Sequence, residues 1–109
     1  MQPRGMKTFG LDEDEWRYLQ DVFASTQALE KVVLYGSRAK GNYKPFSDID
    51  ITLMGQNLSE SDLTDVMSKL DESSLPYFCD VSLFKNLTSK PLLDHIMRRG
   101  KTIYQRQVS

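Results

Sequence analysis

Residues 36–53 read GSRAKGNYKPFSDIDITL: a glycine–serine pair, ten further residues, and then a segment in which acidic and apolar residues alternate. Successive side chains of a strand point to opposite faces of a sheet. Ile49, Ile51 and Leu53 therefore share an apolar face, whereas Asp48 and Asp50 lie on the other. The alternation predicts a strand over residues 48–54 with one buried face and one acidic face.

Two aspartates on one strand face require an explanation. Strands disfavour Asp, and two like charges about 7 Å apart, at a rise of roughly 3.3 Å per residue, repel each other. Divalent cations with oxygen ligands would relieve this repulsion. A later strand, predicted over residues 77–84, places Asp80 opposite its apolar side chains. If the two strands are neighbours, about 4.8 Å apart, Asp80 joins Asp48 and Asp50 in a nest for one or two magnesium ions. The alternative is three separate aspartates on the solvated side of a sheet.

The glycine–serine pair, Gly36 and Ser37, follows an apolar segment that predicts a strand over residues 31–35. A strand that leads through Gly and Ser into a short helix can form a phosphate-binding corner, because the first backbone N–H groups of a helix lack partners within it. Gly36 would let a phosphate approach the backbone closely. Arg38 is the candidate for a charged phosphate contact. By itself a Gly-Ser pair is more often a plain turn.

Helix signals lie on both sides of this region. One helix is predicted to begin at Asp12 and another at Ser59, each cap being followed three residues later by an acidic residue that completes a capping box. A third is predicted over about 89–99, with Gly100 as a left-handed C-terminal cap and His95 as a structural or exposed residue. Alternating helices and strands predict the α/β class, a small sheet with helices packed on one face. The apolar residues of segment 103–104 are expected to pack back onto the body.

The composition bounds the protein further. A chain of 109 residues and 12.5 kDa predicts one domain over 10–109, preceded by a loosely held lead-in at 1–9. A formal charge of −1 argues against general nucleic-acid binding, and no apolar run is long enough to cross a bilayer. Cys79 is the single cysteine and cannot form an intramolecular disulfide. With no signal peptide apparent, a reducing, cytoplasmic location is the expectation.

At this point the sequence resembles a known family. Gly36-Ser37, a gap of ten residues and Asp48-Ile49-Asp50 match the signature of nucleotidyltransferases of the DNA polymerase β-like superfamily. Together with FCDVSLF at 78–84 and HIMRRGKTIYQ at 95–105, the pattern resembles the minimal nucleotidyltransferase (MNT) family, including MntA-type antitoxins of HEPN/MNT toxin–antitoxin pairs. The resemblance covers roughly residues 12–105. It implies a mixed sheet with helices on one face, two Mg²⁺ ions, and transfer of a nucleoside monophosphate from a nucleoside triphosphate to a hydroxyl group.

Carried over position by position, the resemblance implies that Gly36 and Ser37 hold the triphosphate. Asp48 and Asp50 would ligate the metal ions, with Asp80 as the third carboxylate. One metal would stand beside the attacking hydroxyl, while the other neutralises charge on the departing pyrophosphate.

The small size of the domain leaves little chain for an acceptor pocket, so the acceptor is expected to come from a partner. Stand-alone members that this chain resembles are typically antitoxins of small helical HEPN ribonuclease toxins, and some transfer AMP from ATP to a toxin tyrosine. That activity is the leading hypothesis. One alternative is a non-catalytic module that neutralises its partner by occlusion, and a lesser one is transfer to a small molecule such as an aminoglycoside.

Overall fold

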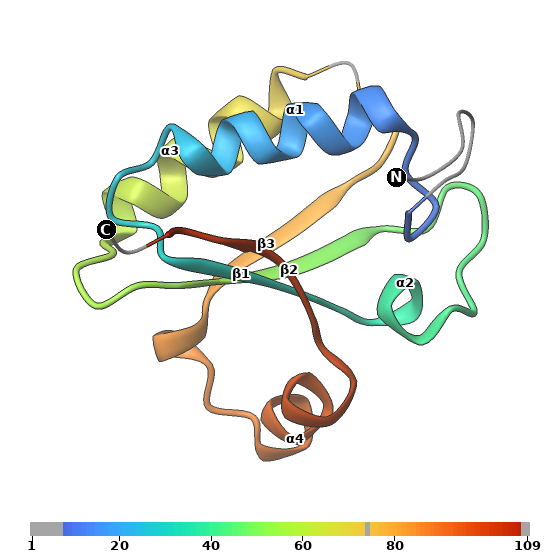
Figure 1. The fold of residues 1–109 in the computed structure, drawn as a ribbon. Coiled ribbons are helices and arrows are strands. Elements are labelled where there is room, and N and C mark those ends of the chain that lie inside the picture. Colours follow the sequence, from blue (N-terminus) through green and yellow to red (C-terminus); the bar gives the residue numbers. More distant parts are fainter. Residues whose placement is uncertain (1–7, 74, 108–109) are drawn as a thin grey trace.

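The computed structural model describes residues 8–73 and 75–107 (Figure 1). In chain order, the regular elements of this part are α1 (Glu13–Ala24), β1 (Lys31–Tyr35), α2 (Ser37–Lys40), β2 (Ile49–Met54), α3 (Glu60–Asp71), β3 (Cys79–Leu83), the short 3₁₀ helix η1 (Phe84–Asn86), α4 (Lys90–Arg99) and β4 (Lys101–Gln105). The predicted α/β class is confirmed. Within the described residues, none of the helices is both long enough and apolar enough to cross a membrane.

The described strands form one mixed sheet in the order β3-β2-β1-β4. Strands β2 and β3 run parallel, whereas β1 is antiparallel to both β2 and β4. The strands predicted at 31–35, 48–54 and 77–84 are all present, with ends within two residues of the prediction. Strand β4 was not predicted as a strand, although Ile103 and Tyr104 do pack back onto the body as expected.

The capping signals begin the helices where they were expected. The Asp12 carboxylate accepts a hydrogen bond from the Glu15 N–H at 2.8 Å, and the Glu15 carboxylate accepts one from the Asp12 N–H at 3.0 Å. Ser59 and Asp62 form the same reciprocal box at the start of α3. Ser89 caps α4, in which Pro91 occupies the first turn, where its missing N–H costs nothing.

Helices cover both faces of the sheet (Figure 1). Helices α1 and α3 pack on one face, where their apolar residues join the apolar faces of β1, β2 and β3 in the main core. Helix α4 packs on the opposite face through Ile96, against Val33 and Tyr35. The sequence pattern predicted helices on a single face. The second layer exists because β1 is apolar on both sides, so that Val33 and Tyr35 also need cover.

Gly100 corrects one prediction about α4. It is not a left-handed cap: its φ of −63° and ψ of 146° are those of extended backbone. The chain passes from α4 directly into β4 at this residue, so no left-handed turn is needed. Glycine is nevertheless required, because a Cβ here would overlap the Ile96 carbonyl oxygen and approach Val33 Cγ1 to 2.6 Å.

The lead-in predicted at 1–9 falls mostly on residues 1–7, which lie outside the described part. Its last two residues are held to the domain. Thr8 and Leu11 form a short antiparallel bridge, and the ring of Phe9 lies 6.3 Å from that of Trp16. Residues 8 and 9 therefore contact the folded domain.

Candidate active site

A row of polar side chains crosses three strands on the α4 side of the sheet. The strand register pairs Tyr35 of β1 with Asp50 of β2, and Asp50 with Asp80 of β3. The next row on this face contains Thr52 and Ser82, whose side chains are hydrogen-bonded at 3.1 Å. Because paired residues of neighbouring strands point to the same face, this register brings Asp50 and Asp80 together, as the sequence predicted. We call this surface the carboxylate face.

Burial and neighbouring negative charges both disfavour the ionised form of Asp50. Burial is the largest cause that raises its pKa above the ordinary value of 3.8, and the negative charges of Asp80 and Asp48 raise it further. Asp48 and Asp80 themselves are exposed, Asp48 lying just before β2. The positive charge of Arg38 acts in the opposite direction. Three carboxylates thus share one region of negative potential, with Asp50 as its least solvated member.

The glycine–serine corner, formed by Gly36 and Ser37, lies directly against Asp50. Gly36 adopts a φ of 77° and a ψ of −156°, a region of backbone space open essentially to glycine alone. A Cβ on Gly36 would overlap Oδ2 of Asp50. Ser37 then begins the short helix α2, as the sequence predicted. Backbone conformation and close approach both require glycine here, and together they place the corner beside the carboxylate face.

The carboxylate oxygens of the site are ligands of the kind that magnesium prefers. In the described part of the chain, no three His, Cys, Asp or Glu side chains form a group that could enclose a metal ion. Magnesium, however, is usually held by one or two carboxylates together with substrate phosphates and water, rather than by an all-protein cage. The mutual repulsion that raises the Asp50 pKa would be relieved by a bound cation. The donor set therefore suits a cation that arrives with a phosphate-bearing substrate.

Arg38 does not lie where a phosphate contact would require it. Its side chain is 1% exposed. The guanidinium donates hydrogen bonds to the Ser47 carbonyl at 2.8 and 3.2 Å and to the Phe9 carbonyl at 2.8 Å. It also lies over the rings of Tyr77 and Tyr43, at 4.5 and 5.3 Å from their centroids. The structure thus gives Arg38 a different role from the one expected: it ties the loop before β2 to the start of the domain.

Two residues at the site were not identified from sequence. Tyr35 is buried on the carboxylate face, and burial is the largest cause that raises its pKa; Asp80 and Asp50 add to this effect, while a hydrogen bond with Ser82 opposes it. His95 reaches from α4 to accept a hydrogen bond from the Gly36 N–H at 3.0 Å. Tyr35 lies two residues after Val33 in β1, so strand alternation could have placed both side chains on the same face. Nothing local in the sequence indicates the His95 contact, because 59 residues separate its two partners.

An apolar hollow lies apart from the acidic site. It has a volume of about 460 Å³ and lies between α3 and the start of β3, lined by residues that include Met67, Leu75 and Cys79. Cys79 points to the core side of β3, away from Asp80. None of the three site carboxylates lines this hollow. This hollow therefore does not serve as a pocket for the carboxylate face.

These features define a class of protein. A mixed sheet with carboxylates paired across two strands, and with a glycine–serine corner beside one of them, is the arrangement of a nucleotidyltransferase domain. The Polymerase beta, Nucleotidyltransferase family matches residues 17–109, and the chain belongs to this family. A comparison with curated protein sequences finds no match.

Solved structures share the fold. A toxin–antitoxin structure with AMP-PNP superposes with a TM-score of 0.67 at 22% identity, covering 84% of this chain and 74% of the other. The tri-AMPylated HEPN toxin of Shewanella oneidensis in complex with MNT antitoxin gives 0.61 at 19%, covering 84% and 70%. The toxin–antitoxin MntA-HepT gives 0.59 at 19%, also covering 84% and 70%. At these identities the likeness is one of fold.

Proposed function

We propose that this protein is a magnesium-dependent nucleotidyltransferase that transfers AMP from ATP to a hydroxyl group of a partner protein. The observation that carries the proposal is the register of β2 with β3, which sets Asp50 opposite Asp80 while Gly36 abuts the Asp50 carboxylate. A triphosphate at the glycine–serine corner would then lie beside the carboxylates.

The reaction is a single displacement at phosphorus. The acceptor oxygen forms a bond to the α-phosphorus of ATP, and the bond from that phosphorus to the α,β-bridging oxygen breaks. Pyrophosphate leaves, and the hydroxyl proton passes to solvent. Magnesium, when bound, supplies charge neutralisation on the phosphate oxygens. Asp50, with Asp48 or Asp80, would hold it together with the phosphate oxygens. Gly36 and Ser37 would orient the triphosphate, so that positioning and electrostatics supply most of the catalysis.

The proposed acceptor is a tyrosine of a HEPN-type toxin, which makes the protein an antitoxin. Two features support this choice. Asp48 and Asp80 are exposed, and the structures that the chain resembles are described as toxin–antitoxin complexes, one with a tri-AMPylated toxin. An added AMP brings bulk and negative charge, which would disturb an RNA-cleaving centre. A reducing compartment suits a chain with a single cysteine.

The test uses the purified chain, the protein encoded beside it, ATP labelled at the α-phosphate, and Mg²⁺. We expect label on the partner, its loss with EDTA, and its loss in Asp48→Asn and Asp50→Asn variants. Asp94→Asn, an exposed carboxylate on α4, is the matched control and should retain full activity. Neutralisation of the partner is measured in parallel.

The Asp48→Asn and Asp50→Asn variants distinguish a catalytic antitoxin from one that acts by occlusion. If the Asn variants fold and still neutralise the partner fully, the protein acts by occlusion and the catalytic proposal is wrong. If the wild-type chain labels an aminoglycoside but not the partner, the acceptor is a small molecule.

A further inference from the structure

Helix α4 reaches the glycine–serine corner with a single side chain. Nε2 of His95 accepts a hydrogen bond from the Gly36 N–H at 3.0 Å. The imidazole stands edge-on to Tyr35, with 6.2 Å between ring centroids and 78° between the ring planes. A ring nitrogen that accepts a hydrogen bond carries no proton, so the ring in this contact is neutral with its proton on Nδ1. Two partners therefore fix both the position and the tautomer of His95.

The bond acts on a flexible point of the backbone. Glycine has more conformational freedom than any other residue, and Gly36 occupies a region that other residues avoid. The peptide on its N-terminal side joins it to Tyr35, the last residue of β1. Without an acceptor for its N–H, this peptide could rotate and move the corner relative to Asp50. The hydrogen bond to His95, which belongs to a different layer of the fold, restrains the N–H of that peptide.

The docking of α4 does not itself depend on the imidazole. Ile96 is buried between α4 and β1, and Leu92 packs against the same small cluster. Gly100 brings the helix end into close contact with Val33. His95, in contrast, is half-buried at the edge of this contact. An apolar side chain at this position would fill the same space, but it could not accept the hydrogen bond.

We propose that His95 is a positioning residue for nucleotide transfer, in which its Nε2 holds the Gly36 peptide so that the glycine–serine corner faces Asp50 in the geometry that a triphosphate requires. The inference rests on the proposed function. His95 acts through Gly36 and takes no part in the bond changes at phosphorus. Supporting residues of this kind typically contribute 10- to 100-fold to activity.

Two substitutions of His95 distinguish the effect of its hydrogen-bond acceptor from the effect of its aromatic ring. His95→Gln retains an acceptor oxygen at a similar reach, whereas His95→Phe keeps the ring edge beside Tyr35 and removes the acceptor. For His95→Phe we expect kcat/KM for ATP to fall about 10- to 100-fold, with the KM for the acceptor protein unchanged. His95→Gln should recover most of the loss. Met97→Gln, on the exposed side of α4, is the control and should behave as wild type.

A second measurement reports on the contact directly. Amide hydrogen exchange at Gly36, followed by NMR, should be slow in the wild type and in His95→Gln, and faster in His95→Phe. His95→Leu is measured in parallel, so that an acceptor-free variant is available if His95→Phe does not fold. ATP affinity is measured by calorimetry for each protein.

The outcomes are distinct. If the wild type transfers AMP and a folded acceptor-free variant matches it in kcat/KM for ATP, the positioning inference is overturned. An equal loss of kcat/KM for ATP in the His95→Gln and His95→Phe variants overturns it as well, since the hydrogen-bond acceptor would then have no effect. If the wild type binds ATP without transferring AMP, the proposed function fails, and the inference is decided by whether the acceptor-free variants bind ATP more weakly. Absence of ATP binding by the wild type overturns both.

Discussion

The environment of Asp50, a proposed metal-binding residue, lowers the stability of the fold. Its pKa in the folded chain is raised, mainly by burial and then by Asp80 and Asp48. A carboxyl whose pKa is higher in the folded than in the unfolded chain destabilises the fold once it ionises, so stability falls as the pH rises from about 4 through the folded pKa. Once ionised, Asp50 therefore disfavours the folded state unless a cation is bound.

We predict that Asp50→Asn raises the melting temperature of the metal-free protein at pH 7. The gain should shrink as the pH is lowered and vanish below the ordinary carboxyl pKa, where Asp50 is protonated in both states. Activity should fall by about 10²-fold or more, because metal ions supply several kcal/mol of charge stabilisation. Scanning calorimetry in EDTA between pH 3 and 8 measures the first effect. Asp94→Asn is the control, and a destabilised Asp50→Asn at pH 7 would contradict the prediction.

Arg38 allows the structural role to be separated from a phosphate contact. Arg38→Met leaves the Ser47 and Phe9 carbonyls without their donor, and we expect a loss of about 1–3 kcal/mol in the free energy of unfolding. Arg38→Lys should not restore it, because an ammonium group lacks the planar fork that spans both carbonyls. Urea unfolding measures the loss, with Arg17→Ala as the control since its ion pair with Glu13 is exposed. A variant of full stability with a raised KM for ATP would instead indicate a phosphate contact.

At the scale of elements, the parts that sequence could predict are those fixed by short-range rules. The two capping boxes, the alternation in β2 and the glycine–serine turn each lie within a few residues. The site depended on the condition that β2 and β3 are neighbours, and their register confirms it. The second helical layer and strand β4 were missed, because only the assembled sheet shows that β1 is buried on both faces and still lacks a neighbour.

The same distinction applies to the candidate site. The facing of Asp50 and Asp80 followed from strand parity, which is a local property. The role of Arg38 did not follow, because its partners lie 9 and 29 residues away and are backbone carbonyls that no side-chain pattern marks. The sequence around a basic residue beside a phosphate-binding corner does not show whether its side chain faces the ligand or the interior.

The junction of α4 with β4 gives a prediction at this scale. Gly100→Ala should destabilise the fold by about 1–3 kcal/mol, because the added Cβ meets the Ile96 carbonyl and Val33 Cγ1. Backbone strain is not involved, since φ is −63°. Gly41→Asn is the control: Gly41 has open space around it and a φ of 86° that Asn tolerates, so we expect a change within about 0.5 kcal/mol. Equal urea midpoints for the two variants would contradict the crowding at Gly100.

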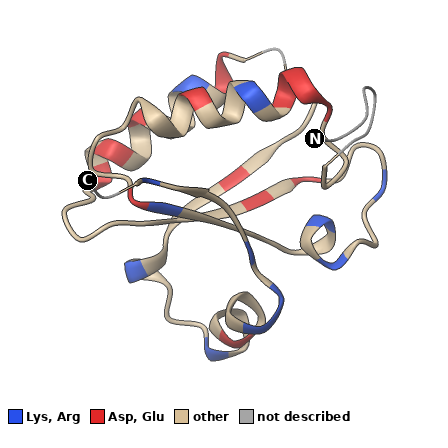
Figure 2. Ribbon diagram, in the orientation of Figure 1, with Lys and Arg blue, Asp and Glu red and all other residues tan. Residues whose placement is uncertain are grey.

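For the whole molecule, charge is distributed by layer (Figure 2). Acidic residues gather on α1 and α3, whereas basic residues gather on α4, the helix that covers the carboxylate side of the sheet. The net charge of −1 averages these two layers and so conceals the difference. The formal charge of −1 argued against general nucleic-acid binding, and it does not exclude this local arrangement, in which a triphosphate would approach beside the basic layer.

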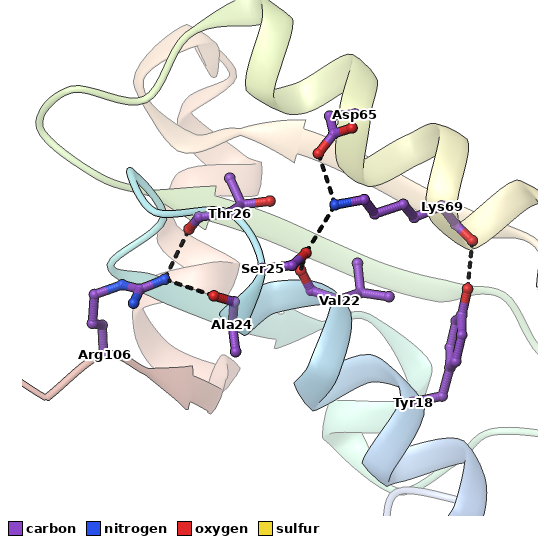
Figure 3. A network of polar contacts seen from close by, with 8 residues as sticks. All are labelled: Tyr18, Val22, Ala24, Ser25, Thr26, Asp65, Lys69 and Arg106. Carbon is purple, nitrogen blue, oxygen red and sulfur yellow. Dashed lines mark hydrogen bonds and ion pairs between the residues drawn. The ribbon is translucent and has the colours of Figure 1, made fainter.

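A network of polar contacts around the end of α1 joins this helix to α3 and to the segment after β4 (Figure 3). Lys69 of α3 donates a hydrogen bond to the Ser25 hydroxyl at 2.9 Å and pairs with Asp65 at 3.0 Å, and the Tyr18 hydroxyl donates to the Lys69 carbonyl at 2.7 Å. Arg106, just after β4, donates to the carbonyls of Ala24 and Thr26 at 3.2 and 2.9 Å. The last described residues are thereby fastened to the first helix.

This fastening gives the prediction for the molecule as a whole. The Arg106 side chain also donates to the Leu29 carbonyl at 3.0 Å, so Arg106→Ala removes the donor from three carbonyls at once. We expect a loss of about 1–3 kcal/mol in the free energy of unfolding, together with faster amide exchange in β4. Arg98→Ala removes an arginine whose ion pair with Asp94 is exposed, and should cost at most about 0.5 kcal/mol. If urea unfolding gives equal losses for the two variants, Arg106 does not fasten β4 to α1, and the edge of the sheet is held by its strand pairing alone.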